Sequence, residues 1–190
     1  MKRNPTFKLS NGVRYKVLKT GVEAKQTGSR EPDLAAVVRK GSIVDIIFSI
    51  SSAGGSYFYS KGFGFEKALD ASMGISSMND AQAGESYRVR VRGAASESVG
   101  NFERDVPVGI EEALVGMRRG ERRRVELPPA VGFVTSDWRP EPTTRRGRAS
   151  IAGYRQVLEG NGSSQPPFPA ETIWDVEVVR ILASPGQQAE

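Results

Sequence analysis

The sequence predicts an α+β fold, a curved antiparallel sheet of five or six strands wrapped on one short helix, with long loop insertions. Three observations predict it. Several segments alternate polar and apolar residues, a pattern typical of strands with one buried face. A single segment repeats apolar residues at helical spacing. The 21 glycines and 11 prolines suit short strands joined by tight turns better than a helical bundle.

The N-terminal part of the chain is expected to hold a hairpin and the strongest strand. Residues 7–19 alternate, and Asn11 with Gly12 gives a two-residue turn signal, so this segment is interpreted as a hairpin. Residues 21–34 are polar and are expected to form a loop. Residues 42–50 are too apolar for an edge strand with one wet face, so they predict a central strand.

The middle of the chain predicts two further strands and the helix. Residues 57–59 form a short aromatic strand, and the weakly patterned residues 64–84 are expected to be an insertion with at most one helical turn. Residues 87–92 alternate strictly, which predicts a strand with one buried face and one arginine-bearing face. Apolar residues at i, i+3, i+4 and i+7 predict a short amphipathic helix over 110–117.

The last third contains two strands around a long excursion. Residues 122–127 alternate, and the prolines at 128–129 end that strand because proline cannot extend a central ladder. Residues 130–170 are expected to be mostly irregular, and a loop of this length is usually functional or loosely ordered. Residues 172–182 predict a long closing strand.

Length and composition point to one core. A chain of 190 residues with 38% hydrophobic content predicts a single domain over 1–185, with insertions at about 61–86 and 130–170 and a disordered tail at 186–190. No apolar run reaches the roughly 18 residues of a membrane span, and no signal-type segment follows the basic start. The chain is therefore expected to be soluble, and a transit peptide removed before residue 1 is compatible with it.

The absence of histidine and cysteine excludes disulfides, thiol nucleophiles, imidazole bases and Cys/His zinc sites. The acidic residues form no loop of alternating carboxylates, so neither a metal nor a cofactor is expected. Glu111 and Glu112 are interpreted as an exposed helix start that matches the helix dipole.

The formal charge is +5, and the arginines cluster at 118–124 and 145–148. Such clusters either dock phosphates or an acidic protein surface, or form a solvated strand face and loop. Binding of nucleic acid through these clusters and through Arg88, Arg90 and Arg92 is not favoured. The sequence lacks the interleaved exposed aromatic residues that stack on bases.

Four segments match, in order, the motifs of one known family. Residues 106–122 look like a pocket-floor turn, a Gly-aromatic-Glu-Glu-Ala helix and a Met-x-x-Gly-Glu-Lys/Arg sequence. Residues 41–58, 128–133 and 173–178 are similar to the family's central strand, its proline-led segment ending in Tyr-Gly, and its closing Phe-Asp-Val-Glu-Leu strand. The chain thus resembles the FKBP-type peptidyl-prolyl cis-trans isomerases, and its long excursions are most similar to the chloroplast thylakoid-lumen branch, which implies that location.

The resemblance implies an FKBP-like fold and an aromatic pocket that acts on Xaa-Pro bonds of peptides or protein clients. The residues carried over as catalytic are Phe58, Tyr59, Phe133 and Trp174. Those carried over as substrate-binding are Phe48, Tyr87, Val106, Pro107 and Ile110. Without the resemblance, the same aromatic residues are equally well interpreted as ordinary core residues.

The chain departs from the family at four positions. Tyr59 stands where the family has an aspartate, Phe48 and Phe133 replace tyrosines, and Ile110 replaces a tryptophan. Rotation about the amide bond needs no nucleophile, because aromatic walls favour the twisted amide by excluding water. Two lost polar anchors, each worth about 1 kcal/mol, predict weak activity. The alternative is a catalytically degenerate scaffold, bound through its 130–170 loop as an accessory subunit of a photosynthetic membrane complex.

Overall fold

The computed structural model describes residues 5–22, 37–63, 85–92, 104–132, 139–142, 145–158 and 171–183, with only the backbone of residues 146 and 154–158. The strands are β1 (Thr6–Lys8), β2 (Arg14–Lys19), β3 (Ile43–Ser52), β4 (Tyr57–Lys61), β5 (Tyr87–Arg90), β6 (Arg122–Leu127) and β7 (Thr172–Ala183). The helical segments are α2 (Val108–Leu114), the 3-10 turn η4 (Pro129–Val131) and α3 (Arg145–Leu158).

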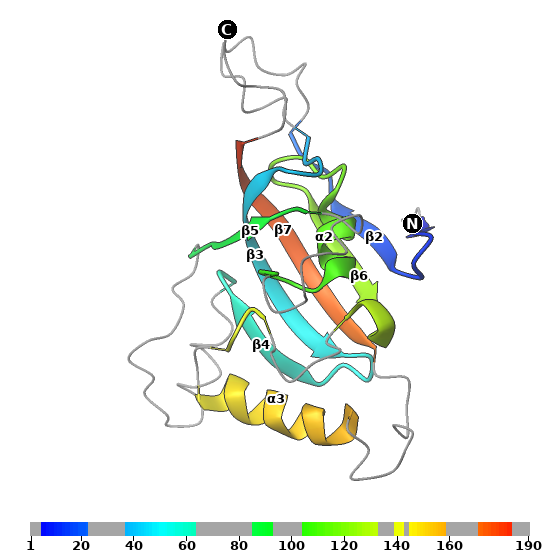
Figure 1. The fold of residues 1–190 in the computed structure, drawn as a ribbon, viewed down its shortest axis with the longest axis vertical. Helices are drawn as coiled ribbons and strands as arrows, with labels where there is room; N and C mark the ends of the chain where they lie inside the picture. Colours follow the sequence, from blue (N-terminus) through cyan, green and yellow to red (C-terminus); the bar gives the residue numbers. More distant parts are fainter. Residues whose placement is uncertain are drawn as a thin grey trace, which may run out of the picture.

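All the strands belong to one antiparallel sheet with the order β1-β2-β6-β7-β3-β4, and β5 also pairs with β3. Figure 1 shows this curved sheet with α2 against one face and α3 alongside β4. Strand β3 is central, as its apolar sequence predicts, because it pairs with three strands. Its inward residues Val44, Ile46, Phe48 and Ile50 are fully buried.

Strands β4 and β5 share one edge of β3, while β7 occupies the other edge. Strand β5 pairs with Ile43–Ile46 of β3, and β4 pairs with Phe48–Ser51, so the two strands meet beside the middle of β3. Gly62 makes this junction possible. It has a φ of 86°, and a Cβ atom there would lie 2.2 Å from Ile47 Cγ2 and 2.6 Å from the Glu85 carbonyl oxygen.

Helix α2 packs its apolar side onto the sheet, and Ile110, Ala113 and Leu114 are fully buried. The helix ends at Leu114, earlier than the sequence predicts, although Met117 is also buried in the core. Arg123 of β6 reaches the end of this helix, where its Nη1 donates hydrogen bonds to the carbonyl oxygens of Ala113 (2.7 Å) and Val115 (3.1 Å). A cation at a helix C-terminus stabilises the exposed carbonyl groups.

The interpretation of Glu111 as an exposed helix start is wrong. Its side chain is 0% exposed, and its Oε2 accepts hydrogen bonds from Arg104 Nη1 (2.9 Å) and from the backbone N–H of Arg92 (2.8 Å). Only Glu112, which accepts a hydrogen bond from Asn11, lies at the helix surface and is partly exposed. Burial of a carboxylate requires such a partner, and Arg104 lies in a segment with no sequence pattern to reveal it.

The antiparallel α+β architecture is confirmed, with three differences in detail. The described residues form seven strands where five or six are expected, and the expected N-terminal hairpin supplies two of them, β1 and β2. The loop between the paired positions Lys8 and Arg14 is longer than a two-residue turn. Helix α3 lies within the excursion that is expected to be mostly irregular, and Ile151 anchors it in the core.

Parts of the predicted insertion and tail lie outside the described residues, namely 64–84 and 184–190. Within the described residues, no helix combines the length and the apolar character that a membrane crossing requires.

Candidate functional site

Three aromatic rings surround Phe48 in the middle of β3. Tyr59 and Tyr87 meet its ring edge-on, with centroids 5.6 and 6.0 Å away and interplanar angles of 88° and 86°. Trp174 packs at 5.4 Å with a tilt of 37°. Edge-to-face packing places the positive edge of one ring against the negative face of another, which favours this geometry over parallel stacking. Phe48 and Trp174 are both fully buried.

The strand register brings these rings together. Residues directly opposite each other in an antiparallel pair project from the same face of the sheet. Trp174 and Tyr59 are both opposite Ile50, and Tyr87 is opposite Ile46. Because Ile46, Phe48 and Ile50 alternate along β3, all three rings project from the face that carries Phe48.

A β-bulge in β4 buries two consecutive aromatic residues. The pairing of β3 with β4 shifts between Ile50 and Ser51, so Phe58 is an extra residue between the paired Tyr57 and Tyr59. Phe58 is 5% exposed and Tyr59 is 3% exposed, whereas Tyr57 is only half-buried. Strict alternation would have exposed either Phe58 or Tyr59, so the bulge is what aims the Tyr59 side chain into the site.

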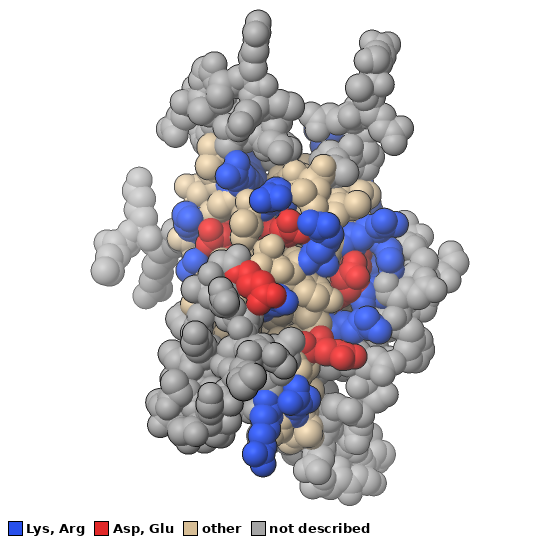
Figure 2. All heavy atoms as spheres, turned by 90° about the vertical axis from the view of Figure 1, so that its left-hand side faces the viewer, with Lys and Arg blue, Asp and Glu red and all other residues tan. Residues whose placement is uncertain are grey.

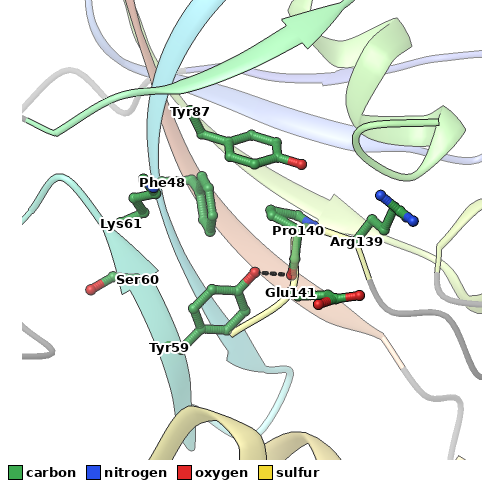
Figure 3. Close-up of a pocket in the computed structure, with 8 residues that line it drawn as sticks. All are labelled: Phe48, Tyr59, Ser60, Lys61, Tyr87, Arg139, Pro140 and Glu141. Atoms are coloured by element: carbon green, nitrogen blue, oxygen red, sulfur yellow. Dashed lines mark hydrogen bonds between the residues drawn. The ribbon is translucent and has the colours of Figure 1, made fainter. Parts of the chain in front are cut away.

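A cavity of about 230 Å³ lies beside these rings, at the junction of β4 and β5. Figure 3 shows its walls, with Tyr59 and Tyr87 on either side of Phe48 and the Pro140 ring between the two tyrosines in this view. The residues that line it are Phe48, Tyr59, Ser60, Lys61, Tyr87, Arg139, Pro140 and Glu141. A few polar groups at the edge of aromatic walls are typical of a ligand site.

The 139–142 segment lies against the sheet through Pro140. Pro140 is buried, while Arg139 and Glu141 on either side are exposed. The Tyr59 hydroxyl donates a hydrogen bond to the Pro140 carbonyl oxygen, drawn as the dashed line in Figure 3. Helix α3 follows this segment and packs on β4, the strand that carries Tyr59.

Asp105 fixes the orientation of Tyr87. The Tyr87 hydroxyl donates a hydrogen bond to the Asp105 carbonyl oxygen (3.1 Å), and the Asp105 carboxylate accepts one from the backbone N–H of Arg90 (3.0 Å). Burial raises the pKa of Tyr87 above the ordinary phenol value, and the negative charge of Asp105 acts in the same direction. Tyr87 therefore acts at neutral pH as a hydrogen-bond donor and an apolar wall.

We expect Tyr87 to titrate above pH 10, measured on ζ-¹³C-labelled tyrosine by NMR with Tyr87→Phe for assignment. Because the folded-state pKa is raised, the folded protein keeps this proton longer than the unfolded chain. The contribution of Tyr87 to stability is complete below the unfolded pKa and is lost as the pH rises through the folded pKa. A Tyr87 signal that titrates at or below pH 10 would contradict this.

The structure places the predicted site residues in three groups. Phe48, Tyr59 and Tyr87 line the cavity, and Trp174 packs behind Phe48. Phe58, which precedes Tyr59 in β4, is buried. The other described residues lie at the start of α2, where Val106 and Ile110 are buried and Pro107 is the N-cap residue of the helix. Phe133 lies outside the described residues.

Sequence reasoning missed five residues that line the cavity: Ser60, Lys61, Arg139, Pro140 and Glu141. Lys61 pairs with Phe48 in the register of β3 and β4, so both side chains project from the same face of the sheet. The sequence alone does not predict this register, and so it does not identify Lys61. Nothing local to the Arg-Pro-Glu-Pro sequence indicates that its first proline returns to the sheet.

Most arginines of the 118–124 cluster have acidic partners within the chain. Arg122 and Arg124 pair across the sheet with Glu177 (2.7 Å) and Asp175 (2.7 Å), and the buried Arg123 pairs with Glu121. On the face viewed in Figure 2, acidic side chains lie among the basic ones. These pairs favour the interpretation of this cluster as part of the sheet, with Arg123 buried and its two neighbours on the outer face.

Comparison with known proteins identifies the family. The model of the FKBP-type peptidyl-prolyl cis-trans isomerase family matches residues 35–179. The chain is 28% identical over 149 residues to the chloroplastic peptidyl-prolyl cis-trans isomerase FKBP16-1 of Arabidopsis thaliana, a match that covers 78% of this chain and 54% of that protein. This chain therefore spans about half the length of that curated relative.

A solved plant structure shows the same fold. The N-terminal domain of FKBP42 from Arabidopsis thaliana aligns with a TM-score of 0.50 and 14% identity, covering 96% of both chains. FkpA from Escherichia coli aligns with a TM-score of 0.48 and 16% identity over 97% of this chain and 55% of that one. With the family model spanning well over half of its residues, this chain belongs to the FKBP-type peptidyl-prolyl cis-trans isomerase family.

Proposed function

We propose that this chain is a weak peptidyl-prolyl cis-trans isomerase that binds the Xaa-Pro bond of a peptide or protein client in the cavity beside Phe48. The observation that carries the proposal is the group of rings around Phe48, in a chain of this family, beside a cavity of about 230 Å³. Prolyl isomerisation needs no nucleophile or base, which suits a chain without histidine or cysteine.

The rings would act by lowering the barrier to amide rotation. The planar amide is stabilised by resonance that separates charge, and water stabilises this charged form. Phe48, Tyr59 and Tyr87 would exclude water from the bond and contact the proline ring, which favours the less polar twisted amide. Trp174 would hold Phe48 in place from behind. Phe58, Phe133, Val106, Pro107 and Ile110 remain proposed members of the site, supported by the family resemblance.

Weak activity is proposed because two polar anchors of the family are replaced. Tyr59 stands in place of an aspartate, and Phe133 lacks the hydroxyl of the tyrosine that the family has at that position. One hydrogen bond contributes about 1 kcal/mol net, so two losses lower the efficiency on the order of tens of fold. The Tyr59 hydroxyl partly offsets this loss, because it is a donor that already binds a carbonyl oxygen within the site.

The experiment that tests this proposal follows cis-to-trans conversion of Xaa-Pro peptides by NMR exchange spectroscopy. We expect the wild type to exceed the buffer rate, and Tyr87→Ala to reduce the excess about tenfold or more because one wall of the cavity is lost. Tyr15→Ala is the matched control, since Tyr15 is half-buried on β2 and packs on Phe7 and Arg123 instead. A wild-type rate equal to buffer, or equal losses in both variants, would reject the proposal.

A second candidate function is a scaffold that has lost catalysis and holds a partner as an accessory subunit of a photosynthetic membrane complex. The observation that favours it is the position of Pro140, which lies where a client proline would approach Phe48. Stable co-purification with one complex, together with a rate equal to buffer, would support this function over catalysis.

We also propose a chloroplast location, and within it the thylakoid lumen. The support for the chloroplast is the printed name of the Arabidopsis relative, and the support for the lumen is the resemblance to that branch of the family. Fractionation of chloroplasts with protease protection distinguishes the lumen from the stroma.

A further inference from the structure

We propose that the cavity beside Phe48 has a resident ligand in the chain itself: Pro140 occupies the prolyl position, and Tyr59 binds its carbonyl oxygen as it would bind that of a client. Three observations concern the same few atoms. Pro140 is buried among aromatic residues, its carbonyl accepts the Tyr59 hydrogen bond, and its two neighbours remain exposed. This inference rests on the proposed function, because it names what the same site binds.

The burial along 139–141 confines the contact with the site to one side chain. Here a single proline is buried between two exposed charged residues. The segment contacts the sheet at the place where β4 and β5 meet and where Tyr59 and Tyr87 project.

Tyr59 has a defined role in this arrangement. The family resemblance implies an aspartate at this position, which at neutral pH can only accept hydrogen bonds, whereas the tyrosine hydroxyl donates one to a carbonyl oxygen. Tyr59 is 3% exposed, and its hydroxyl donates to the carbonyl oxygen of the residue beside Phe48, so a ligand that brings a carbonyl group to this place keeps the hydrogen bond. We therefore infer that Tyr59 is a specificity-determining residue.

The consequence is competition between Pro140 and a client. A client prolyl residue reaches Phe48 only in molecules whose 139–141 segment has moved away, so the apparent dissociation constant equals the intrinsic one divided by the open fraction. Helix α3 keeps the segment close to the site, because it follows directly in the chain and packs on β4. A tethered ligand has a high effective concentration, which strengthens this competition.

The test compares peptide binding to Pro140→Ala and to Pro142→Ala by isothermal titration calorimetry. The probe is an acetylated and amidated Ala-Arg-Pro-Glu-Pro peptide, which copies residues 139–142 after an added alanine. A peptide with alanine in place of the first proline is its control. We expect Pro140→Ala to bind the probe about five- to tenfold more tightly than the wild type, because removal of the ring raises the open fraction. Pro142→Ala, the same change two residues later, should bind like the wild type. Equal affinity in both variants, or no binding by any form, would overturn the inference.

The role of Tyr59 is tested in the Pro140→Ala background. Adding Tyr59→Phe there should weaken binding of the probe about fivefold, the effect of one ordinary hydrogen bond. Tyr57→Phe is its matched control, since Tyr57 lies on the same strand and its hydroxyl bonds to Ser60 Oγ (2.9 Å). An unchanged affinity in the double variant would remove Tyr59 from the binding role.

A second measurement tests the inference if the Pro140→Ala variant folds poorly. The ζ-¹³C signal of Tyr59 should shift when Pro140 is replaced and return when the probe is added, and unfolding in urea shows whether the fold is intact. The isomerase rate is measured separately. If Pro140→Ala binds the probe more tightly but the wild-type rate equals that in buffer, the proposed catalysis is rejected and the role of Pro140 is kept. If the rate exceeds that in buffer but Pro140→Ala and Pro142→Ala bind the probe equally, the catalysis is kept and the role of Pro140 is rejected.

Discussion

Replacement of Glu111 by alanine is expected to lower the free energy of unfolding by about 3–5 kcal/mol, because it leaves the Arg104 guanidinium buried without its carboxylate. The change also removes the acceptor for the backbone N–H of Arg92 (2.8 Å), which lies just after β5. Both losses affect the region that holds β5 against α2. Unfolding in urea, followed by circular dichroism, measures the effect.

The adjacent residue provides the control for this prediction. Glu112 is half-buried at the surface of the same helix and bonds to Asn11, so Glu112→Ala should cost only about 1 kcal/mol. In a double-mutant cycle, Arg104→Met with Glu111→Leu should recover much of the loss, since it removes both buried charges together. A Glu111→Ala variant as stable as Glu112→Ala would show that the buried pair contributes little.

The strands were predictable because a strand with one buried face alternates apolar and polar residues. Strand β6 occupies Arg122–Leu127, the bounds that alternation and the following prolines predict. Strand β7 extends one residue beyond the predicted end. The sequence also predicted that β3 is a central strand. A strand with neighbours on both edges and a covered face carries apolar residues almost continuously.

Two features that sequence reasoning missed are the burial of Arg123 and helix α3. The clustering of arginines at 118–124 favours a solvated face, but alternation along β6 turns Arg123 inward, where it meets Glu121 and the end of α2. Helix α3 does not stand out in the sequence because two glycines, Gly147 and Gly153, interrupt it, and its apolar anchor Ile151 depends on the core for a neighbour. Propensity alone does not predict a helix of that composition.

The candidate site was partly predictable for a similar reason. The order of family motifs assigned Phe48, Tyr59 and Tyr87, which line the described cavity. The role of Tyr59 could not be read from the sequence, because a departure from a family pattern says what is lost and not what replaces it. Its hydrogen bond to Pro140 joins positions 81 residues apart, and only the folded chain brings them together.

Replacement of Trp174 by alanine is expected to cost about 3–5 kcal/mol of stability and to reduce the isomerase rate, or peptide affinity, more than tenfold. The indole is fully buried between β3 and β6, and its removal leaves a void directly behind Phe48. A Phe48 ring that is free to tilt into this void no longer presents a fixed wall to a proline ring. Core packing and site geometry thus depend on the same side chain.

The comparison that separates these two effects uses Leu127→Ala. Leu127 is equally buried on the neighbouring strand, but it packs against α2, where a Cβ atom at Gly109 would lie 2.4 Å from its Cδ1. This variant should lose about 2–5 kcal/mol of stability and keep the wild-type rate at temperatures where it remains folded, as judged by near-ultraviolet circular dichroism. Trp174→Phe, which retains a ring behind Phe48, should recover most of the rate. If folded Trp174→Ala were as active as Leu127→Ala, Trp174 would be a core residue with no part in the site, and the wall that positions the client would have to consist of Phe48, Tyr59 and Tyr87 alone.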